Sequence, residues 1–168
     1  MFRKILVAVD GSRTSRLGLE EAIQLAKEQN ATLYLLHVVE EQILIQDPSV
    51  ASGMYIDDFL RTLRENGKTI LAEAEAVVKR SHVRAKALMV ENFASPIADV
   101  IVTQAKKLKV NLIVLGTHGR RGVKRLVMGS DAEGVIRETP VPVLLVRSSE
   151  PPVRPRGKRK TAKSTKAH

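Results

Sequence analysis

The chain contains no cysteine among its 168 residues. Disulfide frameworks, thiolate nucleophiles and cysteine-based zinc sites are therefore excluded. Tryptophan is also absent, and aromatic residues make up only 3% of the sequence, so the aromatic platforms that stack on single-stranded nucleic acid are not indicated. The absence of cysteine, together with the lack of a signal-like segment, favours a cytoplasmic location.

Long apolar runs are missing too. The apolar run near the start, residues 5–9, is short and ends at Asp10, whereas a secretory signal needs a longer one. No stretch approaches the ~20 apolar residues of a membrane span, so none is expected. With 43% hydrophobic and 27% charged residues, the composition is typical of one globular domain with a sizeable core.

Acidic residues are scarce at the end of the chain. Residues 148–168 contain seven Lys or Arg and one acid, Glu150, so they carry +6 of the formal net charge of +10 and leave +4 for residues 1–147. This segment is proline-rich and has few aliphatic side chains, which predicts a disordered basic tail after a folded domain of residues 1–147. The tail is either a solvated charge run or a weak contact for nucleic acid or another acidic partner.

Apolar runs typical of strands alternate with amphipathic helical segments. Strands are expected at residues 4–9, 32–39, 83–90, 110–115 and 141–146, and helices at about 14–30, 57–80, 96–108 and 131–138. Ser95 is expected to be the N-cap of the third helix, with Pro96 at its first position. This alternation predicts an α/β fold: a single doubly wound, Rossmann-like domain with a five-stranded parallel sheet and helices on both faces.

Ligands of such sheets bind outside the carboxyl ends of the strands, where the strand order reverses. Asp10 and Gly116 each follow or end a strand, so both are expected to face one crevice. The segment from Gly116 to Ser130 joins the fourth strand to the last helix. Its glycines leave main-chain N–H groups bare, and the helix N-terminus adds positive potential, which together favour phosphate binding.

The glycine spacing is Gly-x2-Gly-x9-Gly-Ser, at Gly116, Gly119, Gly129 and Ser130. No lysine follows the last glycine, so this is not a Walker A motif, and the spacing is not a dinucleotide fingerprint. Two plainer interpretations stay open. The glycines can serve tight turns alone, and Ser130 with Glu133 has the pattern of a capping box.

Four cations lie inside the same segment and either contact phosphates or form a solvated basic loop: Arg120, Arg121, Lys124 and Arg125. The histidines show no metal-ligand spacing. His118, within the glycine segment, is expected to support the loop. No nucleophile–base pair stands out, so no dedicated catalysis is expected, and ATP hydrolysis would be slow.

The glycine motif and its flanking strands resemble the universal stress protein family. The resemblance also includes residues 5–12 with Asp10, the end of the second strand at residues 37–39, and residues 140–147, so it covers residues 1–147. It implies the adenine nucleotide alpha-hydrolase-like form of the fold and binding of ATP, ADP or AMP. The implied role is that of a stress-response sensor or switch.

The resemblance also implies roles for individual residues. The phosphates would be held by main-chain N–H groups and a hydroxyl at Gly116, Gly119, Gly129 and Ser130. Asp10 would lie by the ribose. The main chain of Val38 would meet the adenine edge, and the apolar wall would comprise Ala8 with Met89 or Val90.

Two positions depart from the family's pattern. Asp131 follows Ser130 where nucleotide-binding relatives often carry Val or Thr. Its carboxylate suits the helix dipole but repels a triphosphate unless Mg²⁺ or Mn²⁺ arrives with the phosphates. Residues 91–94 replace a glycine-containing turn after the third strand.

Two functions are therefore compared. The first is a nucleotide-binding stress protein, and the alternative is a nucleotide-independent interaction protein acting through the basic tail. In either case a homodimer is expected through the strand at residues 141–146. That strand is short, apolar and last in the domain, exposed strand edges are usually paired, and the family commonly dimerises there.

Overall fold

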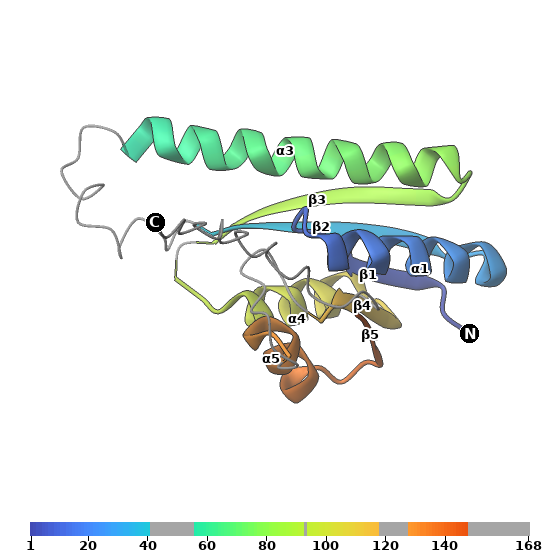
Figure 1. The fold of residues 1–168 in the computed structure, drawn as a ribbon. Helices are drawn as coiled ribbons and strands as arrows, with labels where there is room; N and C mark the ends of the chain where they lie inside the picture. Colours follow the sequence, from blue (N-terminus) through green and yellow to red (C-terminus); the bar gives the residue numbers. More distant parts are fainter. Residues whose placement is uncertain (41–55, 93, 118–127, 148–168) are drawn as a thin grey trace, which may run out of the picture.

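A computed structural model of the chain describes residues 1–40, 56–92, 94–117 and 128–147 (Figure 1). All nine elements lie within two residues of their expected bounds. In chain order they are β1 (Lys4–Ala8), α1 (Arg13–Gln29), β2 (Thr32–Glu40), α3 (Ile56–Arg80), β3 (Arg84–Asn92), α4 (Ile97–Leu108), β4 (Leu112–Gly116), α5 (Ser130–Glu138) and β5 (Val143–Val146).

The five strands form one parallel sheet in the order β3-β2-β1-β4-β5. The first strand is therefore the central one. The chain builds outward through β2 to β3 and then returns to the other side of β1 with β4. The strand order reverses between β1 and β4, which confirms the doubly wound fold and places the switch point at the carboxyl ends of these two strands.

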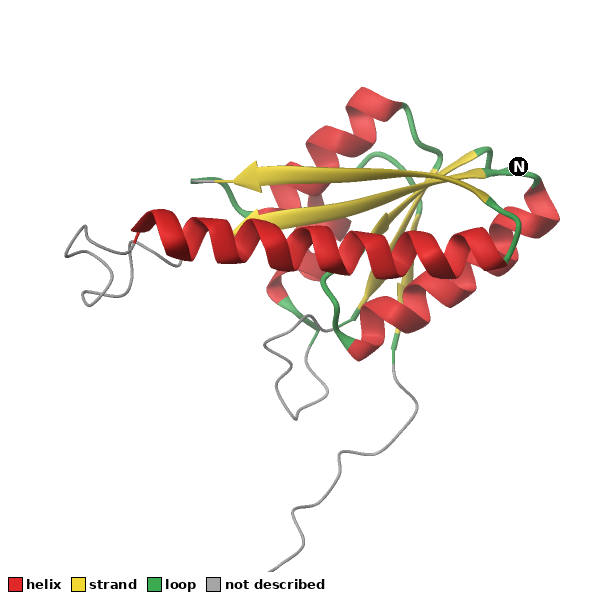
Figure 2. Ribbon diagram, turned by 90° about the horizontal axis from the view of Figure 1, so that it is seen from above, coloured by secondary structure: helices red, strands yellow, loops and turns green. Residues whose placement is uncertain are grey.

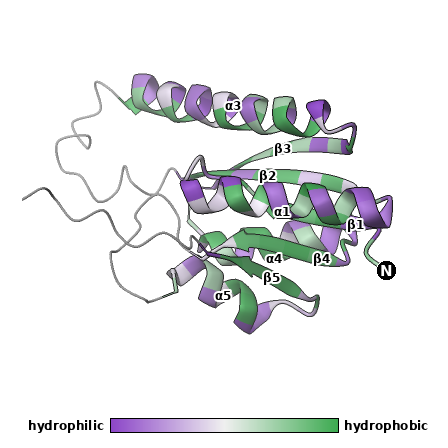
Figure 3. Cartoon of the chain, turned by 45° about the vertical axis from the view of Figure 1, so that its right-hand side comes forward, coloured by the Kyte–Doolittle hydropathy of each residue, from purple (hydrophilic) through white to green (hydrophobic). Residues whose placement is uncertain are grey.

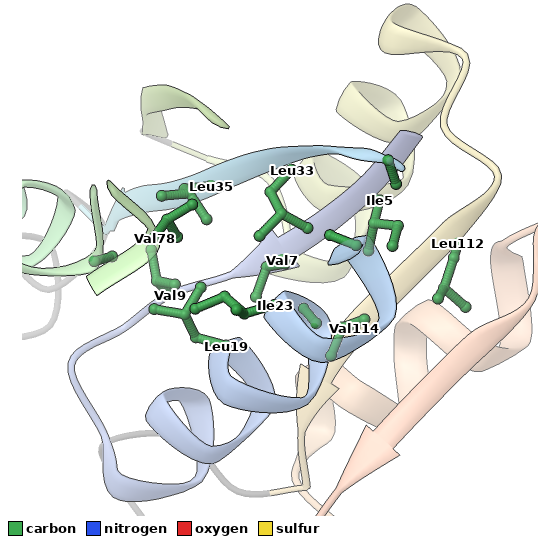
Figure 4. Packing of buried hydrophobic residues seen from close by; sticks show 14 of the residues in the cluster. Ile5, Val7, Val9, Leu19, Ile23, Leu33, Leu35, Val78, Leu112 and Val114 are labelled. Atoms are coloured by element: carbon green, nitrogen blue, oxygen red, sulfur yellow. The ribbon is translucent and has the colours of Figure 1, made fainter. Parts of the chain in front are cut away.

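The helices cover both faces of the sheet (Figure 2). Residues of α1 and α3 pack on one face, and residues of α4 and α5 pack on the other. Because side chains alternate along a strand, β1 sends Ile5 and Val7 to the first core and Leu6 to the second. Figure 4 shows the first core, and Figure 3 shows the apolar faces of the helices turned toward the sheet.

Helix α4 begins differently from the expected pattern. Pro96, with φ −54° and ψ 143°, is the N-cap, and its carbonyl accepts the first helical bonds from Asp99 and Val100. The expectation that Ser95 caps this helix is therefore wrong. The Ser95 N–H instead donates to Asn92 Oδ1 at 3.1 Å, because the turn before the helix is organised by the asparagine side chain.

Helix α5 also begins one residue earlier than expected. Gly129 is its N-cap and accepts from the Glu133 N–H at 3.0 Å. Ser130 therefore lies in the first turn, where its hydroxyl donates to Asp131 Oδ1 at 3.3 Å. The capping-box interpretation of Ser130 and Glu133 is wrong, because a residue inside the helix cannot fold its side chain back as an N-cap.

The expected tail, residues 148–168, lies outside the described residues. Among the helices that the structure describes, none combines the length and apolarity needed to cross a lipid bilayer.

Candidate functional site

The turn between β1 and α1 directs the chain away from the sheet. Asp10 Oδ1 accepts from the Ser12 N–H at 2.8 Å, and Gly11 has φ +78°, a left-handed conformation that favours glycine. Ser12 then caps α1, since its Oγ accepts from the Ser15 N–H at 3.1 Å. The chain therefore enters α1 within a few residues of the carboxyl end of β1.

The end of β4 packs closely against the start of α1. A Cβ atom on Gly116 would lie 2.8 Å from the carbonyl carbon of Thr14 and 2.9 Å from its Cβ and Oγ1. Only glycine fits this approach without moving α1. The structure thus brings Gly116 beside the first turn that follows Asp10, as the strand-end positions predict.

Main-chain hydrogen bonds fix the start of α5 at the same edge. The Thr117 N–H donates to the Val146 carbonyl at 2.8 Å, and the Gly129 N–H donates to the Thr117 carbonyl at 2.9 Å. The two ends of the glycine segment are therefore bonded to each other, although twelve positions separate their numbers. Ser130 and Asp131 follow in the first turn of α5, with their N–H groups at the positive end of the helix.

Part of the predicted phosphate site lies outside the described residues. This holds for Gly119, for His118 and for the four cations of the segment, residues 120, 121, 124 and 125. Gly116, Gly129 and Ser130 are described, and the hydrogen bonds above place all three at the carboxyl edge of the sheet.

The predicted apolar wall is divided between the two faces of the sheet. Ala8, Val38 and Val90 belong to the core that faces α4 and α5, and Val38 pairs with Val90 in the strand register. Met89 packs on the opposite face, toward α3. Of the two alternatives for the wall, Val90 shares a face with Ala8 and Val38, whereas Met89 does not.

His37 has a structural position that sequence patterns did not assign. The residue is only 3% exposed, and Nδ1 bonds to the Val9 carbonyl at 2.7 Å, next to the turn at Asp10. The ring lies against Gly67 of α3. In the sequence, this contact could have been indicated by a histidine within an apolar strand and a glycine inside a predicted helix thirty positions later.

Side chains hold the end of β3 and the turn that follows it. Arg64 of α3 donates to both carboxylate oxygens of Glu91, from Nε at 2.9 Å and from a terminal nitrogen at 3.0 Å. These hydrogen bonds hold the pKa of the Glu91 carboxyl below its ordinary value. Asn92 is buried, and its amide donates to the Ser95 carbonyl at 2.6 Å. An asparagine side chain thus closes the turn that follows β3.

No group of three His, Asp or Glu side chains among the described residues is arranged to hold a metal ion. The described parts of the site are main-chain N–H groups, two carboxylates, one hydroxyl and an apolar wall.

The strand order and the converging turns define a doubly wound α/β protein with its candidate ligand site at the topological switch point. The chain belongs to the universal stress protein family, which it matches over residues 1–147. Universal stress protein YxiE of Bacillus subtilis is 36% identical over 152 residues, which cover 88% of this chain and 100% of that protein.

Solved structures of universal stress proteins share the fold. The structure of UspA from Lactobacillus plantarum has a TM-score of 0.73 and 25% identity, and the match covers 86% of this chain and 97% of that one. A protein from Archaeoglobus fulgidus in complex with dAMP has a TM-score of 0.61 and 21% identity, covering 86% and 97% of the two chains. A complex with cAMP has a TM-score of 0.57 and 23% identity, covering 87% and 97%.

Proposed function

We propose that this protein binds an adenine nucleotide, ATP, ADP or AMP, and acts as a stress-response sensor or switch in the cytoplasm. One observation supports this most: the turn after Asp10, the end of β4 at Gly116 and the start of α5 meet at the switch point of the sheet. The dAMP and cAMP complexes of proteins with the same fold support the choice of ligand.

The proposed binding mode follows the polarity of the crevice. The phosphates lie at Gly116, Gly119, Gly129 and Ser130, where the α5 N-terminus contributes positive potential. The Gly129 N–H is itself bonded to the Thr117 carbonyl, so the N–H groups that follow it in α5 supply the donors there. Mg²⁺ or Mn²⁺ accompanies the phosphates and screens them from Asp131.

The nucleoside occupies the other part of the crevice. Asp10 lies by the ribose, and the main chain of Val38 meets the adenine edge. Ala8 and Val90, which share the α4 and α5 face with Val38, form the apolar wall. We assign no catalytic residue, so any hydrolysis of ATP is slow.

Calorimetric titration tests this proposal. The native protein should bind ATP, ADP or AMP saturably, with micromolar affinity or better, in the presence of Mg²⁺. Gly119→Val should abolish binding by filling the phosphate site, and Ser130→Ala should weaken it. Gly18→Ala, on the buried face of α1, is the control and should bind normally. Absence of saturable binding to the native protein would overturn the proposal.

The charge of the last segment favours a second candidate function. Residues 148–168 carry +6 by sequence, enough for salt-dependent binding to nucleic acid or another polyanion without a nucleotide. Deletion of residues 148–168 should then remove binding to a labelled DNA duplex and flatten its salt dependence, while ATP binding is retained. Unchanged DNA binding after the deletion would exclude this role.

A further inference from the structure

At the carboxyl end of β1, a side-chain hydrogen bond replaces a main-chain bond of the ladder between β1 and β2. Ala8 pairs with Leu36, and the Val9 N–H donates to the Leu36 carbonyl at 2.8 Å. In a regular parallel ladder the next bond would run from the Val38 N–H to the Val9 carbonyl. The bond that the Val9 carbonyl makes is instead with His37 Nδ1, at 2.7 Å.

This substitution leaves part of the main-chain edge of β2 beyond the end of β1. Leu36 directs its carbonyl toward β1, so Val38, two residues further along the strand, directs its N–H and carbonyl to the same side. There the chain has turned away at Gly11. No main-chain bond from the Val38 N–H or carbonyl to the β1–α1 turn is present among the described residues. Val38 therefore directs one donor and one acceptor beyond the end of β1, without a main-chain partner in the described β1–α1 turn.

We propose that His37 is a positioning residue that keeps this edge available for the nucleobase. Its imidazole donates a hydrogen bond to the Val9 carbonyl. Without the imidazole, this carbonyl would accept a hydrogen bond from the Val38 N–H and extend the ladder. With the imidazole in place, the Val38 N–H and carbonyl remain as a donor–acceptor pair for the adenine edge. This inference rests on the proposed adenine-nucleotide site and adds the side chain that keeps the main chain of Val38 available to the nucleobase.

Gly67 supports this role independently. Glycine is unfavourable inside a helix, yet Gly67 lies within the 25 residues of α3. A Cβ atom there would approach His37 Cδ2 to 2.8 Å and Nε2 to 3.2 Å. The glycine thus provides the space in which the ring is held against the Val9 carbonyl.

The tautomer of His37 follows from its partner. A carbonyl oxygen only accepts, so Nδ1 carries the hydrogen. An asparagine amide nitrogen occupies nearly the same place on its side chain as Nδ1, so His37→Asn is the conservative variant. His37→Leu fills the space and removes the donor.

Amide hydrogen exchange tests this role of His37 without any ligand. In the native protein, the Val38 amide should exchange much faster than the Leu36 amide, although both lie in β2. In His37→Leu it should become protected, because it then bonds to the Val9 carbonyl. Should the leucine variant fail to fold, Gly67→Ala displaces the ring and should have the same effect. A Val38 amide as protected as that of Leu36 in the native protein would overturn the proposal.

Binding of ATP and ITP tests the consequence for recognition. Inosine reverses the donor and acceptor of the adenine edge, so ITP gains little from Val38. His37→Leu should weaken ATP binding roughly tenfold, the effect of about one hydrogen bond, and leave ITP nearly unchanged. His37→Asn should restore most of the ATP affinity. His82→Asn, at a histidine in the turn between α3 and β3, is the control.

Equal weakening of ATP and ITP would mean that His37 is merely structural. If the native protein binds neither nucleotide, the proposed function fails, whereas the exchange of the Val38 amide still decides whether His37 controls that edge.

Discussion

Gly18 and Gly67 both lie inside helices, but the space beside them differs. A Cβ atom on Gly18 would meet Val114 Cγ1 at 3.6 Å, an ordinary contact, whereas one on Gly67 would lie 2.8 Å from the His37 ring. Gly18→Ala should therefore stabilise the protein by about 0.5–1 kcal/mol through helix propensity. Gly67→Ala should destabilise it by roughly 1–3 kcal/mol through overpacking.

Urea unfolding followed by circular dichroism compares the two variants under identical conditions. Each serves as the control for the other, because the substitution is the same. Equal stability of the two would show that His37 and Met89 move aside without cost.

The contribution of the Arg64–Glu91 pair to the stability of the fold depends on pH in a defined direction. Its hydrogen bonds lower the Glu91 pKa from 4.5, so its stabilisation is present above that value and is lost as the pH falls through the folded-state pKa. Arg64→Gln should raise the Glu91 pKa and remove this contribution near neutral pH. The stability effect should be small, because both side chains are more than one-third exposed.

A carboxyl-carbon NMR titration of native protein and Arg64→Gln measures the Glu91 pKa directly. An unchanged Glu91 pKa in the variant would contradict the assigned cause.

At the scale of elements, the start of α5 combines a helix dipole with an adjacent carboxylate. Asp131 lies in the first turn, where a negative charge stabilises the helix but repels bound phosphates. Asp131→Asn should therefore tighten ATP binding without Mg²⁺ by roughly two- to fivefold. The gain should shrink for AMP and when Mg²⁺ is saturating.

Glu138→Gln makes the same charge change at the other end of α5 and is the matched control. Titration of ATP with and without Mg²⁺ measures the effect. Equal responses of the two variants would mean that Asp131 lies away from the phosphates.

The sequence predicted the elements better than their ends. Apolar periodicity located every strand and helix, since one buried face follows directly from residue spacing. It misplaced the caps at Ser95 and Ser130, because capping depends on the main-chain torsions of a single residue. Asp10 and Gly116 were expected to face one crevice because both follow or end strands, and the structure shows that these two strands end at the same edge of the sheet. The contact between His37 and Gly67 was not predictable, because it depends on how α3 lies across the sheet.

At the scale of the whole molecule, β5 is an edge strand that pairs only with β4 among the described strands. The carbonyls of Pro142 and Val146 accept bonds from β4 and from Thr117 just after it. The alternate residues, Val143 and Leu145, therefore direct their N–H groups away from β4. We propose that two copies of the chain dimerise along this edge.

Val143→Pro removes one outward N–H and should convert the dimer into a monomer while preserving the fold, since proline is tolerated at sheet edges. Light scattering coupled to gel filtration measures the mass, and circular dichroism checks the fold. A native protein that is monomeric at high concentration would refute this arrangement.

The central position of β1 has a consequence for synthesis on the ribosome. Ile5 pairs with Leu33 of β2 on one side and with Leu112 of β4 on the other. The first strand to be synthesised therefore remains unpaired on one side until β4, near the end of the domain, has been synthesised. A nascent chain that has completed β3 has an unpaired edge on its central strand, and such edges promote aggregation. Slow elongation between β3 and β4 would therefore lower the yield of folded protein more than a delay after β4.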